Sequence, residues 1–171
     1  MTLSDEIECA FGMRLKPSRL VDVRNPVTPE QNDALWFSGR DWREIAWQDW
    51  DAHSDAFYAF TPTAFVYYLP SILSVTTRNP EKWLGAADAL LGILNRSPDV
   101  YRWDNFVEKR LIGLGAAEYE AIKAWILSLS GTTVFGDEDA LARAYETVDL
   151  LQRETDRVRR SIGGDNRKIG K

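Results

Sequence analysis

The sequence predicts an all-α fold, a single-domain bundle of about six helices joined by irregular, aromatic-rich connections. Helix-start signals, in which Thr or Asn precedes Pro, recur along the chain. Apolar residues repeat at helical spacing in the segments that follow these signals. Strand signals are weak throughout, and there is no internal repeat or low-complexity tract. With 171 residues, of which 44% are hydrophobic, the chain is long enough for one domain with a sizeable core.

The first two expected helices are short. Residues 4–11 predict a helix with Ser4 as its N-cap and Phe11 on its inward face. Residues 28–31 read Thr-Pro-Glu-Gln, a capping box with proline at the first helical position, and predict a surface helix to about residue 38. Between these helices, residues 20–23 read Leu-Val-Asp-Val and indicate a short extended piece.

A longer helix is expected from Pro62 to about residue 77, because Thr61 supplies another cap before proline. Its apolar stripe runs from Phe65 to Val75. Pro70 lies inside this helix and removes one backbone hydrogen bond, so the helix is predicted to kink or restart there.

The second half of the chain predicts three further helices, over residues 80–95, 114–129 and 137–159. The first follows an Asn79-Pro80 cap signal and places Trp83 on its inward face. The last has acids at its start and arginines at its end, as the helix dipole favours.

These elements define one helical domain over residues 1–160. The remaining residues, 161–171, are polar, basic and contain glycine, so we expect a disordered tail.

Residues 41–75 contain the densest group of aromatic side chains in the chain. A segment with so much apolar ring area is expected to form either the centre of the core or a surface that meets a partner. The group comprises Trp42, Trp47, Trp50, Phe57, Tyr58, Phe60, Phe65, Tyr67 and Tyr68.

Residues 64–70, which read Ala-Phe-Val-Tyr-Tyr-Leu-Pro, resemble the mark of an uncharacterised bacterial family, a domain of unknown function with an A-F-x-Y-Y-L-P helix. The resemblance extends over roughly residues 5–130 through the Gly-Arg-Asp-Trp of residues 39–42 and the helix that begins near residue 114. It implies no established activity, and no catalytic residue is carried over. In build, the chain is also similar to immunity proteins of contact-dependent toxin systems.

Charge is distributed unevenly along the chain. Residues 1–150 carry 14 Lys and Arg against 23 Asp and Glu, a net charge of −9, whereas residues 151–171 carry 7 against 3, a net charge of +4. An acidic body repels nucleic acid and attracts a basic protein, so we expect no nucleic-acid partner.

Few residues offer catalytic or metal-binding chemistry. Cys9 is the only cysteine and His53 the only histidine, and a typical zinc site needs more of these ligands. We expect Cys9 to be a small buried hydrophobe and His53 to lie in an exposed acidic turn. The chain has no glycine-rich phosphate loop and no G-x-S-x-G motif. We therefore expect no cofactor, no metal and no catalytic residue, and an enzyme is the less favoured class.

The compartment expected from the sequence is the cytoplasm. A single cysteine excludes an internal disulfide, which fits a reducing environment. The first residues do not resemble a signal peptide, and no stretch approaches the roughly 20 apolar residues of a membrane span.

The favoured hypothesis is a non-catalytic protein-binding protein, in its specific form an immunity protein that neutralises a basic toxin. Residues 29–60 carry seven acids and two arginines, a net charge of −5, together with tryptophans that we expect to be exposed. Acids steer a basic partner and tryptophans anchor it. The expected binding residues are Trp42, Trp47, Trp50, Asp49, Asp51 and Asp55.

The alternative hypothesis is an enzyme or small-molecule-binding protein with a pocket beside the Pro70 kink. A kink opens room between packed helices, and Tyr67, Tyr68 and Trp50 would line that pocket. Neither hypothesis fixes an oligomeric state.

Overall fold

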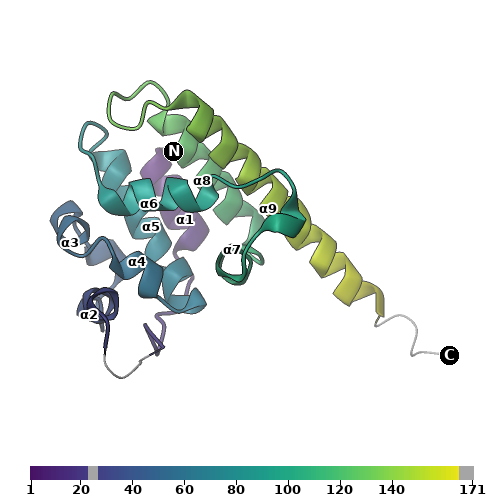
Figure 1. Ribbon diagram of the computed structural model, residues 1–171, viewed down its shortest axis with the longest axis horizontal. Coiled ribbons are helices and arrows are strands. Elements are labelled where there is room, and N and C mark those ends of the chain that lie inside the picture. The colour runs from purple at the N-terminus through teal and green to yellow at the C-terminus, as the bar shows by residue number, and fades with distance from the viewer. Residues whose placement is uncertain (23–26, 166–171) are drawn as a thin grey trace.

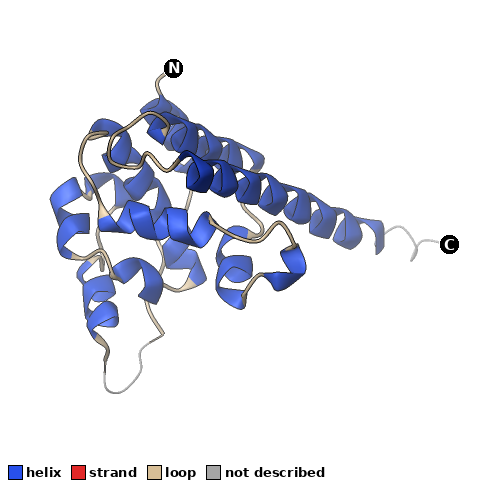
Figure 2. Ribbon diagram, turned by 45° about the horizontal axis from the view of Figure 1, so that its top comes forward, coloured by secondary structure: helices blue, strands red, loops and turns tan. Residues whose placement is uncertain are grey.

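The computed structural model describes residues 1–22 and 27–165, without the side chains of residues 163–165. Over these ranges the chain forms nine α-helices, seven of them with seven or more residues, and two short 3-10 helices, with no strand (Figures 1 and 2). The prediction of an all-α single domain is confirmed. The elements are α1 (Leu3–Phe11), α2 (Pro29–Trp36), η1 (Trp42–Glu44), α3 (Trp47–Ala52), α4 (Ala56–Ala59), α5 (Pro62–Arg78), α6 (Gly85–Leu94), η2 (Val100–Arg102), α7 (Asn105–Leu111), α8 (Ala116–Leu129) and α9 (Glu138–Asp165).

Helix α5 is the centre of the bundle (Figure 1). Every residue from Ala64 to Thr76 is buried, and the helix contacts α1, α3, α6, α7 and α8. A helix surrounded on all sides must be apolar around its whole circumference, and this sequence meets that requirement. The helix is unbroken across Pro70, so the predicted restart does not occur.

Two of the polar side chains inside α5 receive hydrogen bonds from tryptophans on neighbouring helices. The Trp50 indole N–H of α3 donates to the Ser71 hydroxyl, and the Trp125 indole N–H of α8 donates to Thr76 Oγ1 at 2.7 Å. Because buried polar atoms need partners, these bonds fix how α3 and α8 sit against the central helix.

Several helix starts follow the predicted capping chemistry. Thr28 and Gln31 form the expected capping box at α2, and Thr61 accepts a hydrogen bond from the Ala64 N–H at α5. At α1 the cap is Thr2 rather than Ser4, because Thr2 forms a reciprocal box with the Asp5 side chain.

The expected helix over residues 80–95 begins later than predicted, at Gly85. Asn79 ends α5 instead of starting the next helix: its backbone N–H donates to the Thr76 carbonyl and its side chain donates to the Val75 carbonyl. Residues 80–83 therefore form turns, and Trp83 lies outside the helix that was expected to turn it inward.

Helix α9 is longer than predicted. Its buried side chains run from Leu141 to Thr155, and beyond Thr155 the helix projects from the body (Figures 1 and 2). It continues to Asp165, so the first five residues of the tail expected to be disordered over residues 161–171 are helical. The rest of that tail, residues 166–171, lies outside the described part of the chain.

Only one short extended contact occurs in the described ranges. Val21 forms an isolated antiparallel bridge with Phe60, within the extended piece expected at residues 20–23; residue 23 is not among the described residues. None of the helices described here combines the length and the apolar content needed to cross a bilayer.

Candidate functional site

Two of the three tryptophans expected at a binding surface belong to the core. Trp42 is 3% exposed and Trp50 is fully buried between Phe37 and Phe57. The prediction that these rings are exposed is wrong, because the short helices that carry them pack directly on α5. Trp47 is half-buried and does reach the surface.

Of the three acids expected at the binding surface, one caps a helix and two are exposed. Asp49 accepts a hydrogen bond from the Ala46 N–H at 2.8 Å and so caps α3. Asp51 and Asp55 are exposed, and within the described ranges neither side chain makes a hydrogen bond or an ion pair. These two carboxylates are therefore available to another molecule.

A different set of tryptophans reaches the surface beside these free acids. Trp83 is 55% exposed, and Trp36 is half-buried like Trp47. The Trp36 ring stacks on His53 with centroids 4.7 Å apart, while the Trp83 ring and the Ser54 side chain both border Gly85. We call this surface the acidic corner; it comprises Trp36, Trp47, Trp83, Asp33, Asp51 and Asp55.

His53 contacts two residues of the acidic corner, Asp33 and Trp36. Its Nδ1 lies 3.1 Å from Asp33 Oδ1 on α2, and its ring is covered by Trp36 from the end of the same helix. The backbone N–H of His53 donates to the Asp49 carbonyl at the end of α3. His53 is thus half-buried rather than exposed. Its contact with Asp33 links α2 to the turn that bears Asp55.

The pocket hypothesised beside Pro70 is filled by protein atoms. Pro70 is buried, and Trp50, Tyr67 and Tyr68 are at most 2% exposed. The Tyr68 hydroxyl lies 2.7 Å from the Phe37 carbonyl and 3.0 Å from the Arg40 carbonyl, and donates its proton to this turn. The three rings therefore pack in the core and do not line a cavity, and the Tyr68 hydroxyl holds the turn that follows α2.

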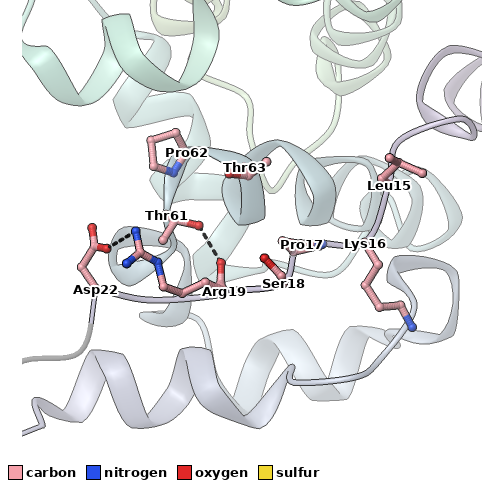
Figure 3. Close-up of a pocket in the computed structure, with 9 residues that line it drawn as sticks. All are labelled: Leu15, Lys16, Pro17, Ser18, Arg19, Asp22, Thr61, Pro62 and Thr63. Atoms are coloured by element: carbon pink, nitrogen blue, oxygen red, sulfur yellow. Dashed lines mark hydrogen bonds and ion pairs between the residues drawn. The ribbon is translucent and has the colours of Figure 1, made fainter.

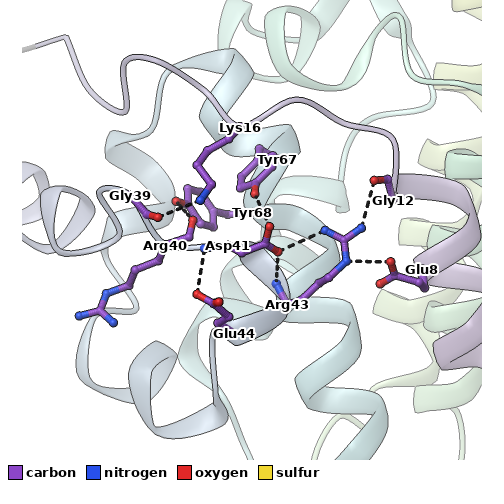
Figure 4. A network of polar contacts seen from close by, with 10 residues as sticks. All are labelled: Glu8, Gly12, Lys16, Gly39, Arg40, Asp41, Arg43, Glu44, Tyr67 and Tyr68. Atoms are coloured by element: carbon purple, nitrogen blue, oxygen red, sulfur yellow. Dashed lines mark hydrogen bonds and ion pairs between the residues drawn. The ribbon is translucent and has the colours of Figure 1, made fainter.

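A polar network connects the same tyrosines to the first helix (Figure 4). Asp41 accepts hydrogen bonds from the Tyr67 hydroxyl at 3.2 Å and from the Arg43 backbone and side chain at 3.0 and 3.2 Å. Arg43 also donates to Glu8 at 2.7 Å and to the Gly12 carbonyl at 3.0 Å. Arg43 is thus paired with both Glu8 and Asp41, and the network joins α1, η1 and α5.

Burial and charge set the pKa values in this network. Burial acts to raise the pKa of Asp41, but the hydrogen bonds from Arg43 and Tyr67 outweigh it, so the pKa lies below its usual range. The pKa of Tyr67 is raised by burial and by the Asp41 carboxylate. A tyrosine held protonated beside an ionised aspartate is a structural hydrogen-bond donor, not an activated nucleophile.

A broad surface depression of about 680 Å³ lies where residues 15–19 pass the start of α5 (Figure 3). Its polar side chains are already engaged. Arg19 pairs with Asp22 at 2.9 Å, the Thr61 hydroxyl donates to the Arg19 carbonyl at 2.9 Å, and Lys16 donates to the Gly39 carbonyl. They do not converge on a common point, so the depression has no catalytic arrangement.

In the part of the chain that the structure describes, no three His, Cys, Asp or Glu side chains are grouped to hold a metal ion. Cys9 is exposed, which corrects the expectation of a buried thiol. The inward residues of α1 are Ile7 and Phe11, and Cys9 stands two positions from each, on the opposite side of the helix.

Comparison with protein-family models finds no match, and neither a curated protein nor a solved structure matches the chain.

Proposed function

We propose that this protein is a non-catalytic protein-binding protein that holds a basic protein on the acidic corner. The observation that supports this most is the position of Trp83. Its ring is 55% exposed beside a turn whose neighbouring acids, Asp51 and Asp55, make no bond within the described chain. Tryptophan is enriched among the residues that dominate binding energy, so an exposed indole next to unpaired acids suits an anchor.

The roles within the acidic corner differ. Trp83 is the anchor. The half-buried rings of Trp36 and Trp47 form the floor around it, with Arg40 3.8 Å from the Trp36 ring centroid and Lys82 5.6 Å from the Trp47 ring centroid. Asp51 and Asp55 steer a basic partner and set its orientation, because exposed charges act mainly on the association rate. His53 and Asp33 keep the floor rigid, which lowers the entropy lost on binding.

The specific form that we propose is an immunity protein that neutralises a basic toxin in the cytoplasm. An acidic body of net charge −9 over residues 1–150 supports a basic target. The proposal retains the charge argument made from the sequence and replaces Trp42 and Trp50 by Trp36 and Trp83.

A toxin-protection assay tests this proposal. The protein is co-expressed with the product of the adjacent gene, and cell survival is compared between the wild type, Trp83→Ala and the double variant Asp51→Lys/Asp55→Lys. The matched control reverses two exposed acids elsewhere, Glu108→Lys/Asp156→Lys. We expect the two acidic-corner variants to lose protection and the control to keep it. Equal survival in all four strains contradicts the proposal.

A further inference from the structure

One exposed stripe of α9 carries acids in its first half and arginines in its second half. At 100° per residue, its members lie within about 60° of one another around the helix axis. All of them are exposed, and the stripe ends beyond Thr155 on the projecting part of the helix (Figure 2). The stripe comprises Asp139, Ala142, Glu146, Arg153, Arg157 and Arg160.

The helix dipole does not account for this separation of charge. The dipole acts within the first and last turns, whereas Glu146 lies two turns inside the helix and Arg153 lies three turns before its end at Asp165. Local pairing accounts for part of it, since Arg153 bonds Asp149 at 2.6 Å and Arg157 bonds Glu154 at 2.6 Å. Such exposed pairs within one helix are weak and leave the arginines free to exchange partners.

The spacing of the charges is self-complementary. Asp139 and Glu146 are seven residues apart, as are Arg153 and Arg160, which corresponds to about 10 Å along the helix. When two copies of α9 lie antiparallel, the register that sets Arg153 opposite Glu146 also sets Arg160 opposite Asp139. A two-fold axis repeats both pairs, so one arrangement brings four opposite-charge pairs together.

An apolar groove of about 370 Å³ lies beside the acidic half of the stripe, between α8 and α9. Leu127 on its α8 side is 61% exposed, and Glu146 stands at its edge. The methylene stems of long arginines cover apolar surface of this kind while their guanidinium groups reach the neighbouring acids. The groove is lined by Ile126, Leu127, Ser130, Glu138, Leu141, Ala142, Tyr145 and Glu146.

We infer that α9 is a dimerisation surface whose partner is a second copy of this chain, packed antiparallel so that the arginine end of each helix lies along the acidic half of the other. Arg159 donates to the Leu114 carbonyl at 3.0 Å, whereas Arg153, Arg157 and Arg160 are exposed on the end of α9 that projects from the body, where they can reach a second molecule (Figures 1 and 2). The interface is isologous and closes as a dimer. The dimer interface lies on a different surface from the acidic corner. Dimerisation does not depend on the function proposed for that corner.

Sedimentation velocity over about 5 to 200 µM protein tests the inference, because a weak dimer appears as a rise in the weight-average sedimentation coefficient. The wild type is expected to dimerise at about 50 mM NaCl and to lose most of the dimer at about 500 mM, since exposed charges are screened. A wild type that stays monomeric at low salt over the whole range overturns the inference.

Charge-swapped variants test the register. Asp139→Arg/Glu146→Arg removes both acids from the stripe, and Arg153→Glu/Arg157→Glu/Arg160→Glu has a wholly acidic one. Each is expected to be monomeric alone, and an equimolar mixture is expected to form the heterodimer.

Three results contradict the inference: dimerisation of either variant alone at the wild-type level, failure of the folded variants to associate on mixing, or loss of the dimer in the remote control Glu108→Lys. Circular dichroism at 222 nm establishes that each variant is folded. Should a variant unfold, the salt dependence of the wild type still decides the question. The acidic-corner variant Asp51→Lys/Asp55→Lys is expected to dimerise as the wild type does, which separates this test from that of the proposed function.

Discussion

Replacing Tyr68 by phenylalanine tests whether the tyrosines of α5 act as structural tethers. The ring of Tyr68 is fully buried, and its hydroxyl lies within hydrogen-bond distance of the carbonyls of Phe37 and Arg40. Phe37 keeps a second donor, the backbone N–H of Arg40, so the substitution leaves mainly the Arg40 carbonyl unpaired. Loss of one hydrogen bond with partial desolvation of its acceptor reduces the free energy of unfolding by about 2 kcal/mol.

Urea unfolding followed by circular dichroism measures this change directly. For a chain of this length, about 2 kcal/mol corresponds to a fall in Tm of about 4–8 °C. Tyr58→Phe is the matched control, because Tyr58 is 49% exposed, and its expected change is below about 0.5 kcal/mol. If Tyr68→Phe is as stable as this control, the hydroxyl does not tether the turn and the argument for a structural role fails.

Two further predictions concern the buried aromatic side chains of this core. Burial raises the pKa values of Tyr67, Tyr68 and Tyr119, so above pH 10 the unfolded chain releases phenolic protons that the folded chain retains. Stability should therefore fall with rising pH, by up to about 1.4 kcal/mol per pH unit for each tyrosine; urea midpoints that stay constant from about pH 9.5 to 11 would exclude this. Trp50→Phe removes buried ring volume and the donor to Ser71, and should lower the free energy of unfolding by about 2–3 kcal/mol, whereas an unchanged urea midpoint contradicts the packing described.

The helical architecture could be predicted because its signals are local. The Thr28 and Thr61 caps depend on residues three positions away, and both appear in the structure as expected. The central position of α5 followed from an apolar stripe, although the structure buries the whole circumference of the helix between Ala64 and Thr76.

The proposed binding surface was harder to predict because exposure depends on where a helix begins. Trp83 was expected to face inward in a helix that starts at Pro80, but Asn79 caps the preceding helix and the next one starts at Gly85. Trp42 and Trp50 lie on helices too short to show a period, so their burial could not be read from spacing. No local signal distinguishes the two roles of Asn79.

The residues of the A-F-x-Y-Y-L-P heptad have distinct structural tasks in this chain. Phe65 stacks on Phe57 with centroids 4.1 Å apart, and the Tyr67 and Tyr68 hydroxyls hold the turn between α2 and η1. That turn follows α2, which ends at Trp36, and leads into η1, after which α3 begins at Trp47. The heptad is therefore buried and helps to position the turn that follows α2.

The most direct test of the acidic corner is a calorimetric titration of the basic partner into purified protein. Trp83→Ala is expected to weaken binding by about 2 kcal/mol, or roughly thirtyfold, as is usual for a tryptophan anchor. Asp51→Lys/Asp55→Lys should weaken it further as the salt concentration falls, because like charges then repel more strongly. The control Glu108→Lys/Asp156→Lys should bind as the wild type does. Unchanged affinity in both acidic-corner variants would show that the partner binds elsewhere and that the acidic corner is only a solvated surface.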